Sequence, residues 1–248
     1  MIVTPHDLLA QREILLAQQS RVCAASAQWE PQLQAVLKLS RRYNYERKHT
    51  HQVTRLALRL FDELWPLHRL SAQERFWLQC AAVLHDIGRC EDREHHKVAL
   101  RIVLSSALLP FDKMTRRIIG SIARYHTKAP PNKKHGHYSA LPESKQQVVR
   151  KLAAILRLGD ALDRSHTKLV KRLWCDVTDD CIAVRCVTRD ESRDAALCER
   201  ANQKGRLLVD VFKRKLVIKT TTVKNLRRDG MLHLCRAIDS GALRFGVA

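Results

Sequence analysis

The sequence predicts a mainly α-helical protein that ends in a smaller α+β lobe. Glycine and proline are scarce, at 8 and 7 of 248 residues, and this composition favours helices. Apolar residues recur at three- and four-residue steps over most of the first two thirds of the chain, as on the buried face of a helix. After about residue 172 the apolar residues of a short stretch occupy every second position instead, which is typical of strands.

The clearest helical pattern lies in residues 52–65. Val53, Leu56 and Leu60 fall on one face of a helix there, and polar residues occupy the other face. Proline lacks a backbone N–H and clashes with the preceding turn of a helix. We therefore expect Pro66 to end this helix.

Further signals mark the other helices. Ser71 followed by Glu74 is a capping-box pattern that predicts a helix start, and Gly88 is expected to stop that helix. The remaining helices of this part are expected at residues 5–40, 94–108, 112–126 and 143–163. Together these elements predict a helical domain over residues 1–172.

The last part of the chain predicts a small α+β lobe over residues 173–221. Residues 181–187, CIAVRCV, alternate between two faces as a strand does, and residues 215–220 form a second expected strand. Residues 190–203 between them carry a helical pattern. We expect residues 222–248 to form a C-terminal helical tail.

Composition and charge indicate the kind of partner. A formal net charge of +20 and a pI of about 10.1 favour contact with a polyanion such as polyphosphate, a nucleotide or RNA, although such charge also serves solubility. The N-terminus is too polar for a signal peptide, and no stretch approaches the ~20 apolar residues of a membrane span. The eight cysteines contain no CxxC pair. We expect a cytoplasmic protein without a membrane partner. The sequence leaves open whether the protein forms a homodimer.

Histidine and aspartate residues lie where the apolar stripes of the expected helices end. His49 extends the stripe of residues 52–65 backwards by one turn, and Asp160 continues the stripe of residues 143–163. The complete set is His49, His85, Asp86, His95, His126 and Asp160.

Two interpretations of these inward polar residues compete. A single buried histidine is more often a hydrogen-bonded core residue than a ligand. Several histidines and carboxylates from different helices form the donor set of a divalent-metal site, because the ion offsets the cost of removing them from water. We favour the metal site, although periodicity alone does not show that the helix ends meet.

The order of the motifs adds a family resemblance. His49 and the segments HQVTRLALRLFDELW, AAVLHDIGR, HHK, ARYHTKAPP and ILRLGDALDRSH resemble the HD superfamily of metal-dependent phosphohydrolases. They look most like the C-terminal region of the exopolyphosphatase/guanosine pentaphosphatase family, and CERANQKGRLLVDVFKRKLVI is similar to its small terminal lobe. The resemblance covers roughly residues 35–220. It implies an HD-type helical bundle followed by a small α+β lobe.

The resemblance also implies one divalent ion per chain, such as Mg, Mn or Fe, and a second ion as in the two-metal members. The implied ligands of the first ion are His49, His85, Asp86 and Asp160, and His95 and His126 match positions that bind the second. Two departures matter: Val98 stands where relatives often show another histidine, and the family's N-terminal actin-like ATPase domains have no counterpart in this sequence. Those domains carry the phosphatase site of full-length relatives, so we expect any catalysis to come from the histidine–aspartate site.

Catalytic roles can be assigned to two carboxylates. We expect Asp86 to be a ligand that also orients the attacking water. Asp163 is either a general base or, as we favour, support for a ligand. The candidates for binding substrate phosphate are the cations that flank the motifs: Lys97, Arg124, Lys128 and Arg164. For any one of them, a solvated surface charge is the more common situation.

These observations leave two functions. The first is metal-dependent hydrolysis of a phosphate ester or anhydride, with polyphosphate, a guanosine alarmone or another nucleotide as substrate. The second is a non-catalytic polyanion-binding or regulatory module, which the high positive charge favours. We favour the hydrolase, because a surface that only binds polyanions does not need inward histidines and aspartates.

Overall fold

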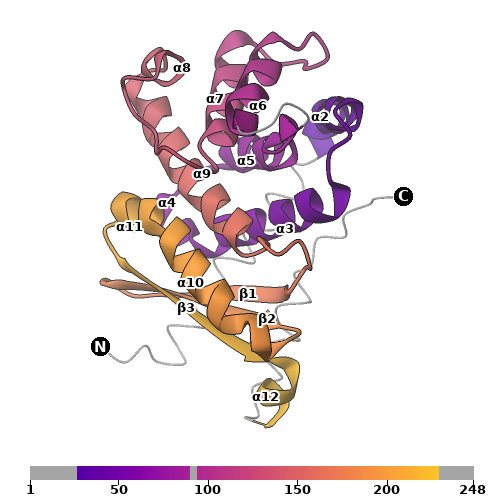
Figure 1. Cartoon of the computed structure of the whole chain (residues 1–248). Helices are drawn as coiled ribbons and strands as arrows, with labels where there is room; N and C mark the ends of the chain where they lie inside the picture. Colours follow the sequence, from indigo (N-terminus) through magenta and orange to yellow (C-terminus); the bar gives the residue numbers. More distant parts are fainter. Residues whose placement is uncertain (1–26, 90–93, 229–248) are drawn as a thin grey trace.

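The structure is a computed structural model that describes residues 27–89 and 94–228. It is a helical body with a small three-stranded sheet on one side (Figure 1). The body contains η1 (Ala27–Trp29), α2 (Glu30–Arg42), α3 (Arg47–Glu63), α4 (Trp65–His68), α5 (Ala72–Leu84), α6 (His95–Ser105), α7 (Lys113–Arg124), α8 (Gly136–Ser139) and α9 (Glu143–Ala161). The expected mainly helical architecture is confirmed.

The small lobe follows the body along the chain. It contains β1 (Val170–Val177), β2 (Cys181–Thr188), η3 (Glu191–Arg193), α10 (Asp194–Lys204), α11 (Arg206–Phe212), β3 (Lys215–Thr222) and α12 (Val223–Arg228). The expected combination of helices and strands is therefore confirmed. The expected helix at residues 5–40 and the expected tail at residues 222–248 extend beyond the described residues.

The core lies where α3, α5, α7 and α9 pack together. The stripe predicted on α3 is buried, with Val53, Leu56 and Leu60 fully inaccessible to solvent. Long apolar side chains on one face of each helix supply this burial, which stabilises the body by removing apolar area from water. No helix among the described residues has both the length and the apolar character needed to cross a membrane.

The helix ends agree with the sequence at one point and differ at two. Ser71 and Glu74 form the predicted capping box at the start of α5. Pro66 does not end α3, which stops at Glu63; it lies in the first turn of α4, where the missing N–H is tolerated. Gly88 does not stop α5 either, because that helix ends at Leu84.

Gly88 has a different role, which is to let α6 come close. A Cβ atom at residue 88 would lie 2.1 Å from the backbone oxygen of His95. Gly159 similarly permits a close crossing of α9 and α3, since its Cβ would lie 3.2 Å from the Cα of Ala57. Both close approaches lie next to residues that the sequence singles out, namely His95 and Asp160.

The three strands form a mixed sheet in the order β1-β2-β3. β1 and β2 are an antiparallel pair, whereas β3 returns parallel to β2 after the crossover through α10 and α11. Ile182, Val184 and Cys186 are buried as predicted, and Ala183 and Arg185 between them are less buried. β1 was not predicted, and it begins at Val170, shortly before the expected start of the lobe.

The outer edge of β1 lies along α3, whose side chains bond to the strand's backbone. Gln52, Arg55 and Arg59 donate to backbone carbonyls of β1 at 2.7, 3.0 and 3.2 Å. Glu63 accepts from the backbone amide of Cys175 at 2.9 Å. These contacts join the small lobe to the helix that begins next to His49.

Candidate metal centre

The ends of five helices meet at one place in the body. His49 lies in the first turn of α3, and Asp160 lies in the last turn of α9. His85 and Asp86 directly follow α5, His95 begins α6, and His126 follows α7. The structure thus brings together all six side chains that the sequence singled out as metal ligands.

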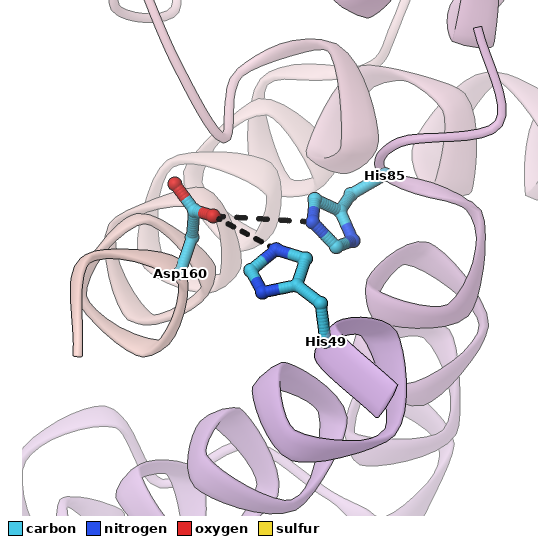
Figure 2. Close-up of side chains that lie close together, drawn as sticks. All are labelled: His49, His85 and Asp160. Atoms are coloured by element: carbon cyan, nitrogen blue, oxygen red, sulfur yellow. Dashed lines mark ion pairs between the residues drawn. The ribbon is translucent and has the colours of Figure 1, made fainter. Parts of the chain in front are cut away.

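Three of these side chains form a buried trio, His49, His85 and Asp160 (Figure 2). The Nε2 atoms of His49 and His85 lie 3.5 and 3.9 Å from Asp160 Oδ1. One ligand atom from each residue lies within 4.8 Å of the others, and all three residues are buried. This spacing can hold one ion between them.

The other three form a more open trio, Asp86, His95 and His126. The Nε2 atoms of His95 and His126 each lie 3.6 Å from Asp86 Oδ1 and 3.3 Å from each other. The second oxygen of Asp86 faces the buried trio, at 3.7 Å from His49 Nε2 and 3.4 Å from His85 Nε2. Asp86 therefore belongs to the open trio through Oδ1 and faces the buried trio through Oδ2.

Hydrogen bonds on the outer ring nitrogens fix three of the imidazoles. His85 and His126 place Nδ1 at 2.7 Å from the backbone carbonyls of Ala82 and Ala123. Because a carbonyl can only accept, each Nδ1 carries the proton, and each Nε2 in the neutral ring presents a lone pair to the centre. Asp163 Oδ2 lies 3.0 Å from His49 Nδ1 and fixes that ring in the same sense.

Several atoms at the centre are buried without a hydrogen-bond partner. They include Nε2 of His49, Nε2 of His85 and Oδ1 of Asp86. The lone pair of the neutral His85 ring and the carboxylate oxygens that it faces cannot satisfy one another, and burial without a partner is costly. A divalent cation is bound by imidazole nitrogen and carboxylate oxygen, so these residues fit a metal ion.

The surroundings of the centre shift the pKa values of its histidines in opposite directions. Burial opposes the charged form of His49, but Asp160 and Asp163 outweigh burial and raise its pKa to about 9. Burial lowers the pKa of His126 to about 3. Burial alone would raise the pKa of the Asp160 carboxyl, but its contact with His49 and the nearby His126 hold it well below its usual range.

Asp163 lies behind His49 rather than at the open side of the centre. It is fully buried, and its second oxygen accepts from the backbone amide of Lys168 at 2.9 Å. Both oxygens are therefore occupied by contacts that orient the carboxylate towards the outer nitrogen of His49. This arrangement would orient His49 for binding a metal ion, and support for a ligand rather than general base stays our prediction for Asp163.

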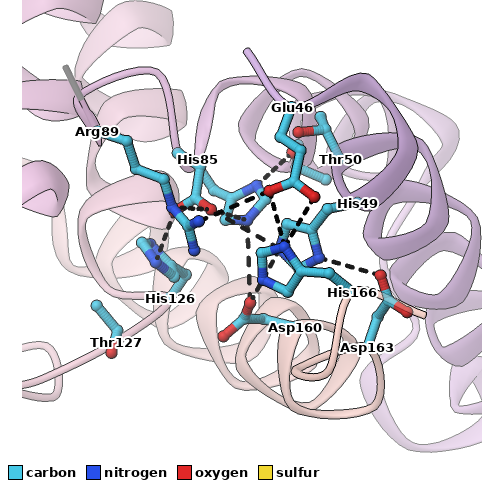
Figure 3. A network of polar contacts seen from close by, with 12 residues as sticks. Glu46, His49, Thr50, His85, Arg89, His126, Thr127, Asp160, Asp163 and His166 are labelled. Carbon is cyan, nitrogen blue, oxygen red and sulfur yellow. Dashed lines mark hydrogen bonds and ion pairs between the residues drawn. The ribbon is translucent and has the colours of Figure 1, made fainter. Parts of the chain in front are cut away.

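Three residues that the sequence did not single out border the centre (Figure 3). The ring of His166 stacks on that of His49 with centroids 3.8 Å apart, and its Nδ1 lies 2.7 Å from Glu46 Oε2. Arg89 forms an ion pair with Asp86, with Nε 2.7 Å from Oδ2. Arg89 and His166 stand inside the quoted motifs, but Glu46 offers no signal, because its partner is distant in sequence.

The four expected phosphate-binding cations have different surroundings. Lys97 is exposed and forms an ion pair with Glu94. Arg124 is buried, and its Nη1 lacks a hydrogen-bond partner. Lys128 and Arg164 are exposed, and the carbonyl of Lys128 accepts from Arg157 at 2.8 Å.

A comparison with protein families gives independent evidence on this chain. Residues 32–199 match Ppx/GppA phosphatase, domain III. A search of curated proteins found no match. The family match covers most of the chain, including all six residues of the two trios, and it agrees with the resemblance noted in the motifs. The chain belongs to the Ppx/GppA phosphatase domain III family.

Proposed function

We propose that this protein is a metal-dependent phosphohydrolase that cleaves a phosphate ester or anhydride. The convergence of unpartnered, buried nitrogen and oxygen atoms around Asp86 carries the proposal. Such a centre is costly without a cation, and paired divalent sites that share a carboxylate are suited to phosphate chemistry. The relation to exopolyphosphatases and the resemblance to HD phosphohydrolases support it further.

The residues divide into two ligand sets joined by one carboxylate. His49, His85 and Asp160 would hold one ion, while His95 and His126 would hold a second. Asp86 would contact both, because each of its oxygens faces a different trio. When bound, divalent ions lower the pKa of water and neutralise charge on phosphate oxygens.

The protein's own groups orient the reactants. Asp86 stands between the trios and would hold the attacking water in line with phosphorus. Asp163 keeps Nε2 of His49 turned towards the centre through its contact with Nδ1. Substrate would enter beside His95, whose side chain is 22% exposed, since the residues of the buried trio are enclosed.

The alternative is a non-catalytic module that binds polyphosphate or RNA through its positive charge. The net charge of +20 favours this alternative. It leaves the buried, unpartnered ligand atoms without a role, and for that reason we favour the enzyme.

A hydrolysis screen tests the proposal. The purified protein is loaded with Mg²⁺, Mn²⁺ or Fe²⁺ and incubated with a polyphosphate, a guanosine alarmone, a cyclic nucleotide and a nucleoside triphosphate. We expect phosphate or nucleotide release from at least one class, and its loss on adding a chelator. Polyanion binding without hydrolysis of any class would favour the non-catalytic module instead.

A further inference from the structure

The small lobe contacts the segment that follows His126 through Lys204, the last residue of α10. Both α10 and α11 pack against α9, the helix that carries Asp160 (Figure 1). Nζ of Lys204 donates to Oγ1 of Thr127 at 2.8 Å. Thr127 directly follows His126, and Figure 3 shows these two side chains next to each other at the border of the centre.

Hydrogen bonds from Arg157, a residue of α9, hold the backbone of the segment that carries Thr127. This guanidinium donates to the carbonyls of Tyr125 at 3.2 Å and Lys128 at 2.8 Å. Lys128 adopts a left-handed conformation with φ of 56°, so the chain turns sharply directly after Thr127. The acceptor of Lys204 is therefore fixed by a side chain of α9.

The other side of the contact is fixed by Gly205. A Cβ atom at this position would lie 2.8 Å from the backbone oxygen of Ala201 and 2.1 Å from Cδ2 of Leu216, so glycine suits the α10–α11 corner beside β3. Lys204 precedes this corner directly. Its ammonium group is thus placed by packing within the small lobe as well as by Thr127.

Several other charges act on the ammonium group of Lys204. Burial lowers its pKa, Asp160 raises it, and the positive charges of Arg157, Arg164 and Lys128 lower it further. Among the described residues, Lys128, Arg164 and Lys204 have no ion pair with a carboxylate, whereas the more distant Lys97 has one with Glu94. The neighbouring positive charges act against Asp160 on Lys204, and a bound anion would offset their repulsion.

We propose that Lys204 is a substrate-binding residue, and that Lys204, Lys128 and Arg164 together bind a phosphate adjacent to the one at the two trios. This inference rests on the proposed function. An ammonium group has three donors, and Thr127 accepts from only one of them, so two remain for phosphate oxygens. The favoured substrate therefore carries at least two linked phosphates, and the small lobe is part of its binding site.

The test is calorimetric binding of inorganic tripolyphosphate and of inorganic phosphate to the protein without added metal, so that no hydrolysis occurs. Lys204→Ala is compared with Lys219→Ala, which removes the same charge from an exposed position on β3. We expect Lys204→Ala to weaken tripolyphosphate binding about tenfold, as the loss of a charge-assisted hydrogen bond does. Lys219→Ala should change it less than about threefold, and the weaker binding of inorganic phosphate should likewise fall in Lys204→Ala and not in Lys219→Ala.

Equal weakening by Lys204→Ala and Lys219→Ala would overturn the inference, and so would the absence of tripolyphosphate binding by the unmodified protein. Lys204→Met keeps the aliphatic stem and serves in place of the alanine variant if that variant is unfolded by circular dichroism. The hydrolysis screen on the unmodified protein reports on the proposed function separately. Absence of hydrolysis with a clear difference between the two lysine variants would remove the enzyme but retain the anion site.

Discussion

The two trios of the candidate metal centre differ in how completely the protein encloses them. His49, His85 and Asp160 are buried on all sides. In the open trio, His126 is buried but the side chain of His95 is 22% exposed. A fully enclosed ligand set favours a retained ion, whereas a partly exposed set leaves room for substrate or exchangeable water. One trio is thus suited to retaining a metal ion, and the other is suited to contact with substrate or water.

The trios also differ in the protons that they carry without metal. The carboxylates raise the pKa of His49 in the buried trio to about 9 despite its burial. In the open trio, burial lowers the pKa of His126 to about 3 and also lowers that of His95. Near neutral pH, a proton on His49 therefore takes part of the role of a cation in the buried trio, and the open trio has no such substitute.

The largest effect should come from Asp86, whose two carboxylate oxygens face the two trios. Asp86→Asn keeps the size of the side chain but removes the negative charge between the ligand sets. We expect metal content to fall sharply and metal-dependent hydrolysis to fall by at least about 10³-fold. Metal analysis and rate measurement on the same preparation check this. A folded Asp86→Asn protein with the original rate would exclude the proposed mechanism.

A smaller effect is expected from the support of the buried trio. Asp163→Asn weakens the contact that holds Nδ1 of His49, and losses of this kind cost about 10- to 100-fold in metal affinity. Competition with a chelator measures the affinity of the enclosed ion. If affinity does not change, His49 is oriented by its stacking on His166 instead.

The open trio can be disrupted alone. His95→Ala should lower the metal content by one ion per chain if both sites are filled, while the enclosed ion remains, because His95 belongs to only one trio. The control is His51→Ala, whose Nε2 contacts the hydroxyl of Tyr45 at 3.0 Å outside the centre. Loss of both ions in His95→Ala would show that the trios do not act separately.

The smallest expected effect is the release of a proton from His49 when a metal ion binds. His49, with a pKa of about 9, is protonated at pH 7 and must release its proton when a metal binds. We expect about one proton released per enclosed ion at pH 7, and an affinity that rises with pH until about 9. Calorimetry in two buffers of different ionisation enthalpy measures this release. A release near zero would mean that His49 is already neutral.

The raised pKa of His49 also predicts how the stability of the metal-free protein changes with pH. The pKa of His49 is higher in the folded, metal-free protein than its unfolded value of about 6.5. Its contribution to the free energy of unfolding is therefore complete below pH 6.5 or so and is lost as pH rises to about 9. The melting temperature of the metal-free protein should fall as pH rises across this range. In His49→Gln this fall should be smaller.

The inward orientation of the candidate ligands could be predicted because it depends on local geometry. Each helix fixes which of its residues share a face, so His49, His126 and Asp160 follow from the apolar stripes alone. The division into two trios depends instead on how helices cross, as where Gly159 meets Ala57. No pattern within one helix contains that information.

Residues that reach the centre from distant parts of the chain were missed for a related reason. Glu46 contacts His166, which is 120 positions away, and Lys204 contacts Thr127 from another lobe. β1 was missed because its sequence, VKRLWCDV, does not alternate regularly between apolar and polar residues. Pairing with β2 and the side chains of α3 hold this strand, and both are tertiary contacts.

The row of polar side chains on α3 also affects how the protein behaves at high concentration. A free strand edge is a template on which another chain can add a strand, and this is a common route to aggregation. Gln52, Arg55, Arg59 and Glu63 occupy backbone groups along the outer edge of β1. A second molecule would have to displace these bonds before it could extend the sheet there. The helix that begins at the candidate metal centre thus also blocks strand addition at the β1 edge of the sheet.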